Sequence, residues 1–133
     1  MKIFAISDLH LSFSYPVDPL NWEEVKEYKP MGDIDKAWTD HARLLYDNWV
    51  STVKEEDLVL VAGDISWAMK LEEAYPDLDF LGKLPGKIVA IQGNHDYWWQ
   101  SISRVREAAP SNMNFIQNDF HKTNGLGVCG TRG

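Results

Sequence analysis

The chain has a single cysteine, Cys129, among its 133 residues, so it cannot form an internal disulfide. Its N-terminal apolar run, residues 3–6, is too short for the core of a signal peptide, and Asp8 follows closely. No stretch approaches the roughly 20 apolar residues that a membrane-spanning helix needs. These scarcities argue against a disulfide scaffold and a helical membrane protein, and we expect a cytoplasmic protein.

Basic residues are also scarce. Thirteen Lys and Arg stand against 20 Asp and Glu, which gives a net charge of −7. Without surplus cations the chain cannot readily displace counterions from a phosphate backbone, so no nucleic-acid partner is indicated. The acidic surplus favours solubility and also supplies carboxylates that a metal site requires. With 44% hydrophobic residues, the chain has enough apolar material for one globular domain, residues 1–133.

Three short apolar runs predict buried strands at residues 2–7, 58–62 and 87–91. Two further short strands are expected at residues 114–117 and 126–129. Because residues 58–62 are apolar on both faces, we expect a central strand that is covered on both sides.

Helical patterns separate these runs. A stripe of apolar residues predicts a helix over residues 36–54, formed by Trp38, Ala42, Leu45, Trp49 and Val53. Residues 68–83 are helical in pattern, but Pro76 predicts a division into two short helices, and residues 97–109 form another helix. Residues 11–35 predict an irregular loop with one helical turn over residues 22–28, and such a loop is a candidate lid. The alternation of strands and helices predicts an α/β fold with a parallel sheet.

Polar residues follow each of the three apolar strands: Asp8 and His10, then Asp64, then Asn94, His95 and Asp96. Ligands of open α/β sheets bind outside the carboxyl ends of the strands, so these residues are expected to converge on one crevice. Taken singly, each has an ordinary interpretation: the Asp-x-His pair as surface polarity, Asp64 as a helix N-cap, and His95 as a loop histidine. Their shared position at strand ends favours a metal site.

Each polar group suggests a role. Asp8 and His10 lie two apart, so in an extended segment they would point to the same side and form a pair of metal ligands. Asp64 follows a glycine that permits a tight turn, and its two oxygens can bridge two cations. Asn94 offers a weaker carbonyl ligand. His95 would then point towards substrate, with Asp96 holding its imidazole through a hydrogen bond.

The order of three motifs resembles the calcineurin-like metallophosphoesterase family. The motifs are Asp8-Leu9-His10, Gly63-Asp64 and Gly93-Asn94-His95-Asp96, and the third is the most distinctive. The surrounding stretches, Gly63 to Trp67 and Gly93 to Trp99, are similar to a bacterial branch of phosphohydrolases. The second motif departs from many members, which carry another Asp where this chain has Trp67. The resemblance covers essentially the whole chain and corresponds to the N-terminal portion of the family.

The resemblance implies a four-layer α-β-β-α sandwich with two mixed sheets, here incomplete, and two divalent metals about 3.5–4 Å apart. Asp8 and His10 would bind the first metal, Asp64 would bridge both, and Asn94 would bind the second. His95 would lie beside the phosphate and protonate the leaving oxygen. The implied activity is hydrolysis of phosphate esters by a bridging hydroxide, and mixed His, Asp and Asn ligands suit Mn, Fe or Zn.

The histidines that complete the family's second metal site are missing: a lone metal-binding His and a Gly-His-x-His motif. His41 is expected to be a partly buried structural residue and His121 a surface turn or strand residue. We therefore expect at most one metal in this chain, and the alternative to an enzyme is a non-catalytic remnant with little hydrolase activity. We also expect an uncovered sheet edge that promotes self-association.

Tryptophan is abundant, with six residues. Trp67, Trp98 and Trp99 directly follow the site motifs and would form either an aromatic rim for substrate or part of the core. Trp38 and Trp49 lie on the apolar stripe of the first helix and are expected in the core.

Overall fold

The computed structural model describes residues 1–133 and contains one parallel and one antiparallel sheet. The parallel sheet has the strands β1 (Ile3–Ile6), β2 (Leu58–Val61), β3 (Lys87–Ala90) and β4 (Met113–Phe115), in that order. This confirms the predicted α/β class and its first three strands. The larger sheet is parallel throughout rather than mixed, and the second is a hairpin of β5 (Asp119–Thr123) and β6 (Leu126–Gly130).

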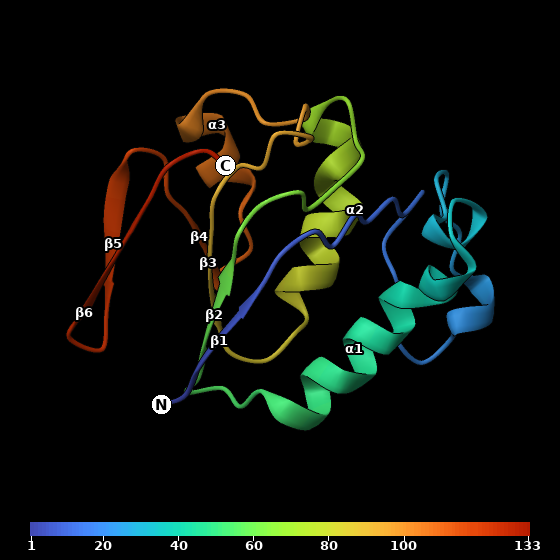
Figure 1. Ribbon diagram of the computed structural model, residues 1–133, viewed down its shortest axis with the longest axis horizontal. Coiled ribbons are helices and arrows are strands. Elements are labelled where there is room, and N and C mark those ends of the chain that lie inside the picture. Colours follow the sequence, from blue (N-terminus) through green and yellow to red (C-terminus); the bar gives the residue numbers. More distant parts are fainter.

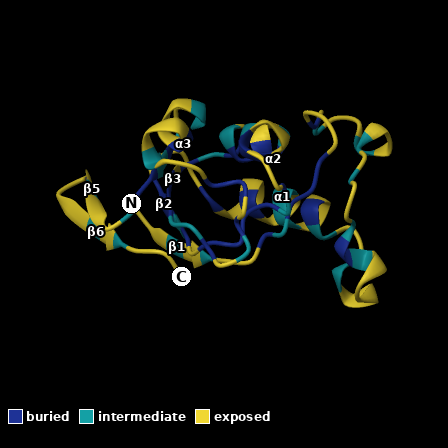
Figure 2. Cartoon of the chain, turned by 90° about the horizontal axis from the view of Figure 1, so that it is seen from above, coloured by how far each residue is buried: buried dark blue, intermediate teal, exposed yellow.

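The helices α1 (His41–Thr52), α2 (Leu71–Gly82) and α3 (Ile102–Ala108) each connect two neighbouring parallel strands. Right-handed crossovers in a sheet whose strands follow the chain order place successive helices on one face. Figures 1 and 2 show the result, with the β5–β6 hairpin on the opposite side of the sheet from α1 and α2. The two faces of the sheet are therefore covered very differently.

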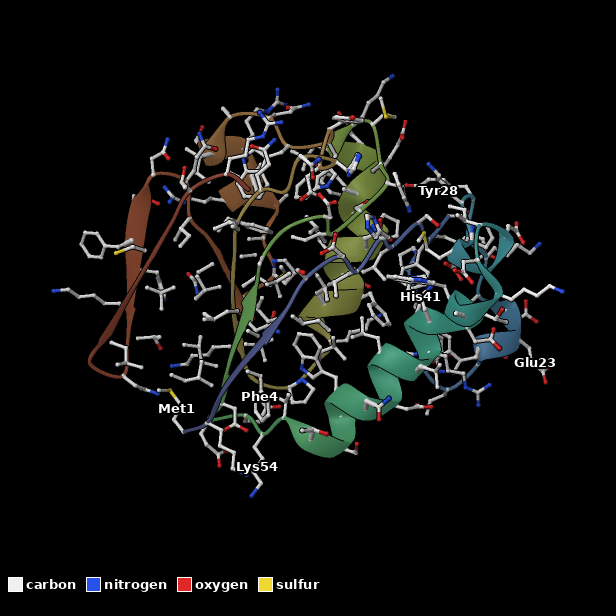
Figure 3. The ribbon with its side chains drawn as sticks, in the orientation of Figure 1. Met1, Phe4, Glu23, Tyr28, His41 and Lys54 are labelled. Carbon is white, nitrogen blue, oxygen red and sulfur yellow. The ribbon has the colours of Figure 1, made fainter.

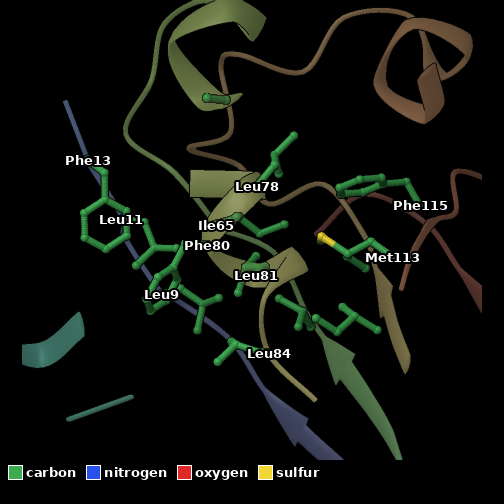
Figure 4. Packing of buried hydrophobic residues seen from close by; sticks show 14 of the residues in the cluster. Leu9, Leu11, Phe13, Ile65, Leu78, Phe80, Leu81, Leu84, Met113 and Phe115 are labelled. Carbon is green, nitrogen blue, oxygen red and sulfur yellow. The ribbon is translucent and has the colours of Figure 1, made fainter. Parts of the chain in front are cut away.

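The main core lies between the sheet and the helices and contains 24 buried apolar residues. Figure 4 shows how Leu78 and Leu81 of α2 meet Phe115 and Met113 of β4 in this layer. Leu11 and Phe13, which follow β1, extend the same core and are almost fully buried. Because burial of large apolar side chains is the dominant favourable term in folding, this layer holds the strand ends in place.

The opposite face of the sheet has a much smaller cluster, formed by Leu58, Val89 and Ile116 under the hairpin. Strand β1 lies at the edge, and Ile3 is 51% exposed. The prediction of a buried strand at residues 2–7 is therefore wrong for this face, because no neighbouring strand or helix covers it. The predicted burial of β2 on both sides is confirmed, since three of its four residues are buried.

The first helix begins later than predicted. Asp40 has a left-handed backbone (φ +57°), which separates the short 3-10 turn at Lys36–Trp38 from α1. Asp35 caps that turn by accepting a hydrogen bond from the Ala37 amide. As a result Trp38 lies outside α1 and is only half-buried, so its assignment to the core is wrong, whereas Trp49 is buried as expected.

Two other helix predictions also needed correction. The region around Pro76 forms one continuous helix, α2, instead of two short ones. Its buried face, with Leu71, Ala74, Leu78 and Leu81, offsets the single backbone hydrogen bond that proline removes. Helix α3 starts at Ile102 rather than residue 97, because Ser101 caps it through the Arg104 amide. None of the helices is both long and apolar enough to cross a membrane.

Strand β5 was not predicted from the sequence. Asn124 (φ +48°) and Gly125 (φ +77°) join it to β6, and left-handed conformations at both central positions define the tight turn typical of hairpins. The Asn-Gly pair is the sequence signal that identifies such a hairpin. Strand β6 confirms the expected strand at residues 126–129.

The connection over residues 11–35 is irregular, with 3-10 turns at Trp22–Glu24 and Met31–Asp33. Its first part is not a loose loop, because Leu11, Phe13 and Val17 are buried in the core. Leu11 also pairs with Ser66 as an isolated bridge. Any lid formed by this region is therefore limited to the residues that it leaves exposed, such as Leu20.

A buried carboxylate joins this connection to the sheet. Asp77 of α2 is fully buried and accepts hydrogen bonds from the Phe13 amide (2.8 Å) and the Ser66 hydroxyl (2.5 Å). Burial raises the pKa of Asp77 to about 7, and its two hydrogen bonds only partly oppose that rise. Asp77 thus connects α2 with the segments that follow β1 and β2.

The raised pKa of Asp77 gives a testable dependence of stability on pH. Because the folded pKa lies above the unfolded one, the folded state binds the extra proton, and the stability contributed by this group falls as pH rises from about 4 to about 7. In urea unfolding, Asp77→Asn should remove this fall. Its amide oxygen can still accept from the Phe13 amide, while its NH2 group would donate to the Ser66 oxygen in place of accepting from it. Asp77→Ala should cost about 1–3 kcal/mol for each partner left unsatisfied. A wild-type and Asp77→Asn pair with identical pH profiles would contradict the assignment.

The exposed edge strand gives a second prediction. We expect the chain to self-associate with rising concentration, because β1 presents unpaired backbone groups beside the exposed side chain of Ile3. Ile3→Lys should shift light scattering towards the monomer. Leu20→Lys, which changes the most exposed large apolar residue elsewhere, should not. A wild-type chain that stays monomeric over the whole concentration range would refute this prediction.

Candidate functional site

Three of the predicted site residues meet at the carboxyl ends of β1 and β2. One ligand atom from each of Asp8, His10 and Asp64 lies within 4.8 Å of the others. The two segments that carry them are joined by backbone hydrogen bonds from the Asp8 amide to Gly63 and from the His10 amide to Asp64, both 3.0 Å. The strand ends therefore bring together residues that are more than fifty positions apart in sequence.

The backbone at these three positions is left-handed. The φ angles are +60° at Asp8, +46° at His10 and +52° at Asp64. The expected extended segment from Asp8 to His10 is therefore wrong, although the two side chains do approach each other, with His10 Nε2 3.5 Å from Asp8 Oδ1. Asp and His tolerate this conformation better than most residues, yet it remains costly, so the surrounding contacts must enforce it.

Two glycines allow the second and third motifs to touch. Gly63 has φ +94°, and a Cβ placed there would lie 2.6 Å from the Gly93 backbone. A Cβ on Gly93 would collide with the amide and carboxylate of Asp64. The glycine before Asp64 thus permits the tight turn that the sequence predicts, and Asp64 does not cap α2, whose N-cap is Lys70.

Asp64 lies at the centre of the site. Its Oδ1 accepts a hydrogen bond from the His95 amide, and its Oδ2 is 3.0 Å from His95 Nδ1 and 3.9 Å from His10 Nε2. Burial alone would raise the pKa of Asp64, but the two hydrogen bonds from His95 and the nearby imidazole charges together hold it below its ordinary value. Asp64 is therefore an ionised carboxylate suited to a cation.

The partner of His95 differs from the predicted one. The expected hydrogen bond to Asp96 is absent, and Asp64 takes its place. Asp96 is fully buried and accepts hydrogen bonds from four donors: the amides of Ile65, Ser66 and Gly93, and Trp98 Nε1. Burial raises the pKa of Asp96, while these hydrogen bonds oppose the rise. Asp96 therefore joins the second motif to the third.

His95 and Asn94 occupy the accessible part of the third motif. The His95 side chain is 44% exposed, and its Nε2 has no hydrogen-bond partner within the chain. Asn94 is exposed in the same loop, between Gly93 and His95. The structure thus leaves both side chains open to a ligand, although Asn94 is not among the three residues whose ligand atoms converge.

Aromatic residues surround His10. Trp67 is half-buried and stacks on the imidazole with ring centroids 4.7 Å apart, and Lys29 Nζ lies 3.5 Å from the Trp67 ring. Trp38 meets His10 edge-on at 6.2 Å. Of the three tryptophans that follow the motifs, Trp67 therefore lies at the rim, whereas Trp98 and Trp99 are buried in the core. The sequence did not indicate Trp38 or Lys29 as residues of this region.

The other two histidines have the expected structural positions. His41 is partly buried at the start of α1, where its Nε2 lies 2.9 Å from the carbonyl oxygen of Leu9 (Figure 3). It supports the segment between Asp8 and His10 from outside the ligand group. His121 lies in β5, paired with Val128, far along the chain from the three motifs.

The residues present fit a metal ion. Two carboxylates and one imidazole converge, and this donor set suits Mn, Fe, Zn or a similar ion. Ion pairs that involve Asp8 or Asp64 contain only histidines, with neither Lys nor Arg. A divalent cation would therefore offset the repulsion between two carboxylates that no basic side chain neutralises.

Comparisons with known proteins found a similar sequence and a similar fold. An uncharacterized protein of Methanocaldococcus jannaschii, MJ1445, is 28% identical over 95 residues, which is 71% of this chain and 47% of that protein. The solved structure of AQ665, a protein of unknown function from Aquifex aeolicus, shares the fold with a TM-score of 0.54 and 16% identity. That match covers 94% of this chain and 56% of AQ665, so the chain spans about half the length of each relative.

A family model covers almost the entire chain. The model, described as calcineurin-like phosphoesterase, matches residues 1–130. That range includes all three strand-end motifs and the two carboxylates and one imidazole that converge in the structure. Members of such a family act on phosphate esters with the aid of metal ions, in accord with the ligand group seen here. The chain belongs to the calcineurin-like phosphoesterase family.

Proposed function

We propose that the chain takes part in the hydrolysis of phosphate esters at a centre of two divalent metal ions. Asp8, His10 and Asp64 would hold the first ion, while Asp64 and Asn94 would contribute to the second. The observation that carries this proposal is the convergence of three ligand atoms within 4.8 Å, in a chain that belongs to this family. When bound, the metals would lower the pKa of a water molecule and neutralise charge on the phosphate.

His95 is the residue suited to donate a proton to the leaving oxygen. In the structure its Nδ1 lies 3.0 Å from Oδ2 of Asp64, which we propose as a metal ligand. The His95 side chain is 44% exposed, so its imidazole is open to a substrate beside the ligand group. There it can reach substrate and act as a general acid.

Asp96 would act through other residues. Its four hydrogen bonds fix the loops that carry Asp64 and His95, and it lies too deep to touch substrate. We therefore propose Asp96 as a positioning residue in place of the direct partner of His95 that the sequence suggested.

A second candidate function follows from the same geometry. Only one group of three ligand atoms converges, whereas Asp64 and Asn94 alone are few ligands for a second ion. The chain would then be a module that binds one metal ion and hydrolyses phosphate esters weakly or not at all. The number of tightly bound ions separates the two functions.

Substitution of Asp64 tests the metal centre. Asp64→Asn should reduce bound manganese, measured by elemental analysis after gel filtration, because the amide lacks the negative charge that attracts the ion. Hydrolysis of 4-nitrophenyl phosphate should fall by more than about 100-fold, since even residues that only support a metal ligand contribute roughly 10–100-fold. Asp47→Asn, an exposed Asp on α1, is the matched control and should change neither. Unchanged manganese in Asp64→Asn would refute the site.

Substitution of His95 tests the proton donor. His95→Gln should keep the bound metal but reduce kcat by about 10²–10⁴-fold for an alkyl phosphate, whose leaving oxygen needs a proton. The loss should be much smaller for 4-nitrophenyl phosphate, because nitrophenolate leaves without protonation. Equal losses for both substrates would show that His95 does not act as the acid.

A further inference from the structure

An apolar cavity borders the metal-ligand group on the side of α1. Its volume is about 360 Å³, which falls within the roughly 300–1,000 Å³ of small-molecule sites. Its walls come from the end of β1, the 3-10 turn before α1 and α1 itself: Ile6, Ser7, Asp8, Leu9, Trp38, His41, Leu44, Leu45 and Asn48. Asp8 therefore belongs both to this cavity and to the ligand group.

A neighbouring cavity lies along the same edge of the sheet. A second apolar cavity of about 210 Å³ lies between β1 and α1, and Ile6, Leu45 and Asn48 line both. Phe4 lines only the far cavity and His41 only the near one, and Figure 3 labels both residues. We refer to the two neighbouring cavities together as the groove. The groove runs from the metal-ligand group towards the opposite end of β1.

The charges of the groove restrict what it can hold. Asp8 is the only acidic residue in either lining, and no Lys or Arg is present. A second phosphate or other anion would lack a partner there and would be repelled by Asp8. The phosphoryl group of a substrate thus belongs at the metal centre, and a neutral organic group fits the groove.

The aromatic wall further defines that group. Trp38 is half-buried and packs edge-on against both His10 (6.2 Å) and His41 (5.6 Å), which fixes its indole beside the ligand group. Leu44 is 55% exposed at the same cavity, so an apolar surface is left open to solvent next to the metal ligands. Aromatic rings pair favourably with such a wall in addition to burying area.

We propose that this groove binds the alcohol or phenol portion of the substrate, and that the chain prefers phosphate monoesters of neutral, largely apolar and especially aromatic groups. The inference rests on the proposed function, because it requires the phosphoryl group to lie at the Asp8, His10 and Asp64 cluster. It assigns Trp38, Leu44 and Leu45 as specificity-determining residues, which neither the family nor the motifs indicate.

Binding of two non-hydrolysable probes tests the groove without relying on activity. In titration calorimetry with the manganese-loaded chain, phenylphosphonate should bind about tenfold or more tightly than methylphosphonate, as expected when an apolar group enters a matching pocket. Leu44→Ala and Trp38→Phe should reduce that ratio. Val50→Ala removes a similarly exposed apolar side chain from α1 outside both cavities and should leave the ratio unchanged.

The outcomes separate the two proposals. Equal affinities for the two phosphonates, or a ratio unaffected by Leu44→Ala, would overturn the groove as a substrate site while the phosphate site stands. Failure of both probes to bind the manganese-loaded chain would overturn the phosphate site and the groove together. A smaller ratio in Leu44→Ala, with methylphosphonate binding unchanged, would support the inference.

Discussion

The backbone contact between Gly63 and Gly93 is the constraint on which the site depends. Neither position has room for a Cβ, so the loops after β2 and β3 touch main chain to main chain. That contact places the Asp64 carboxylate against the amide of His95 and keeps its left-handed backbone in place. A side chain at either glycine would clash with the other loop and separate the two motifs, whereas it would not contact the core side chains directly.

Buried carboxylates reinforce this contact from beneath. Asp96 collects donors from both loops, and Asp77 ties Ser66 to α2 and to the segment after β1. Both side chains are fully buried and have raised pKa values. Their role in the structure is to accept hydrogen bonds from buried donors that would otherwise have no partner. The carboxylates of the ligand group differ from these two, because they are kept close together and no Lys or Arg neutralises them. The fold thus holds two mutually repelling carboxylates together, at a cost in stability, in an arrangement that can bind a cation.

Much of this arrangement was predictable from the sequence. Short apolar runs identified β2 and β3. The polar residues that follow the strands identified Asp8, His10 and Asp64 as neighbours. Helix boundaries failed where a single residue changes the backbone, as at Asp40. The predicted hydrogen-bond partner of His95 was also wrong. Proximity in sequence favoured Asp96, whereas the loop geometry places Asp64 beside the imidazole. Trp38 was assigned to the core and Lys29 was not placed, since their positions beside the site depend on packing between distant segments.

The strand order β1-β2-β3-β4 has a consequence for how the molecule is assembled. Each new strand docks beside the one made just before it, so the sheet can grow at a single edge in the order in which the chain is synthesised. The first and second motifs meet early in that order, and the third arrives last to lock Asp64 through Gly93. Strand β1 is the outer strand of this order, and the groove lies beside it, next to the strand that is made first.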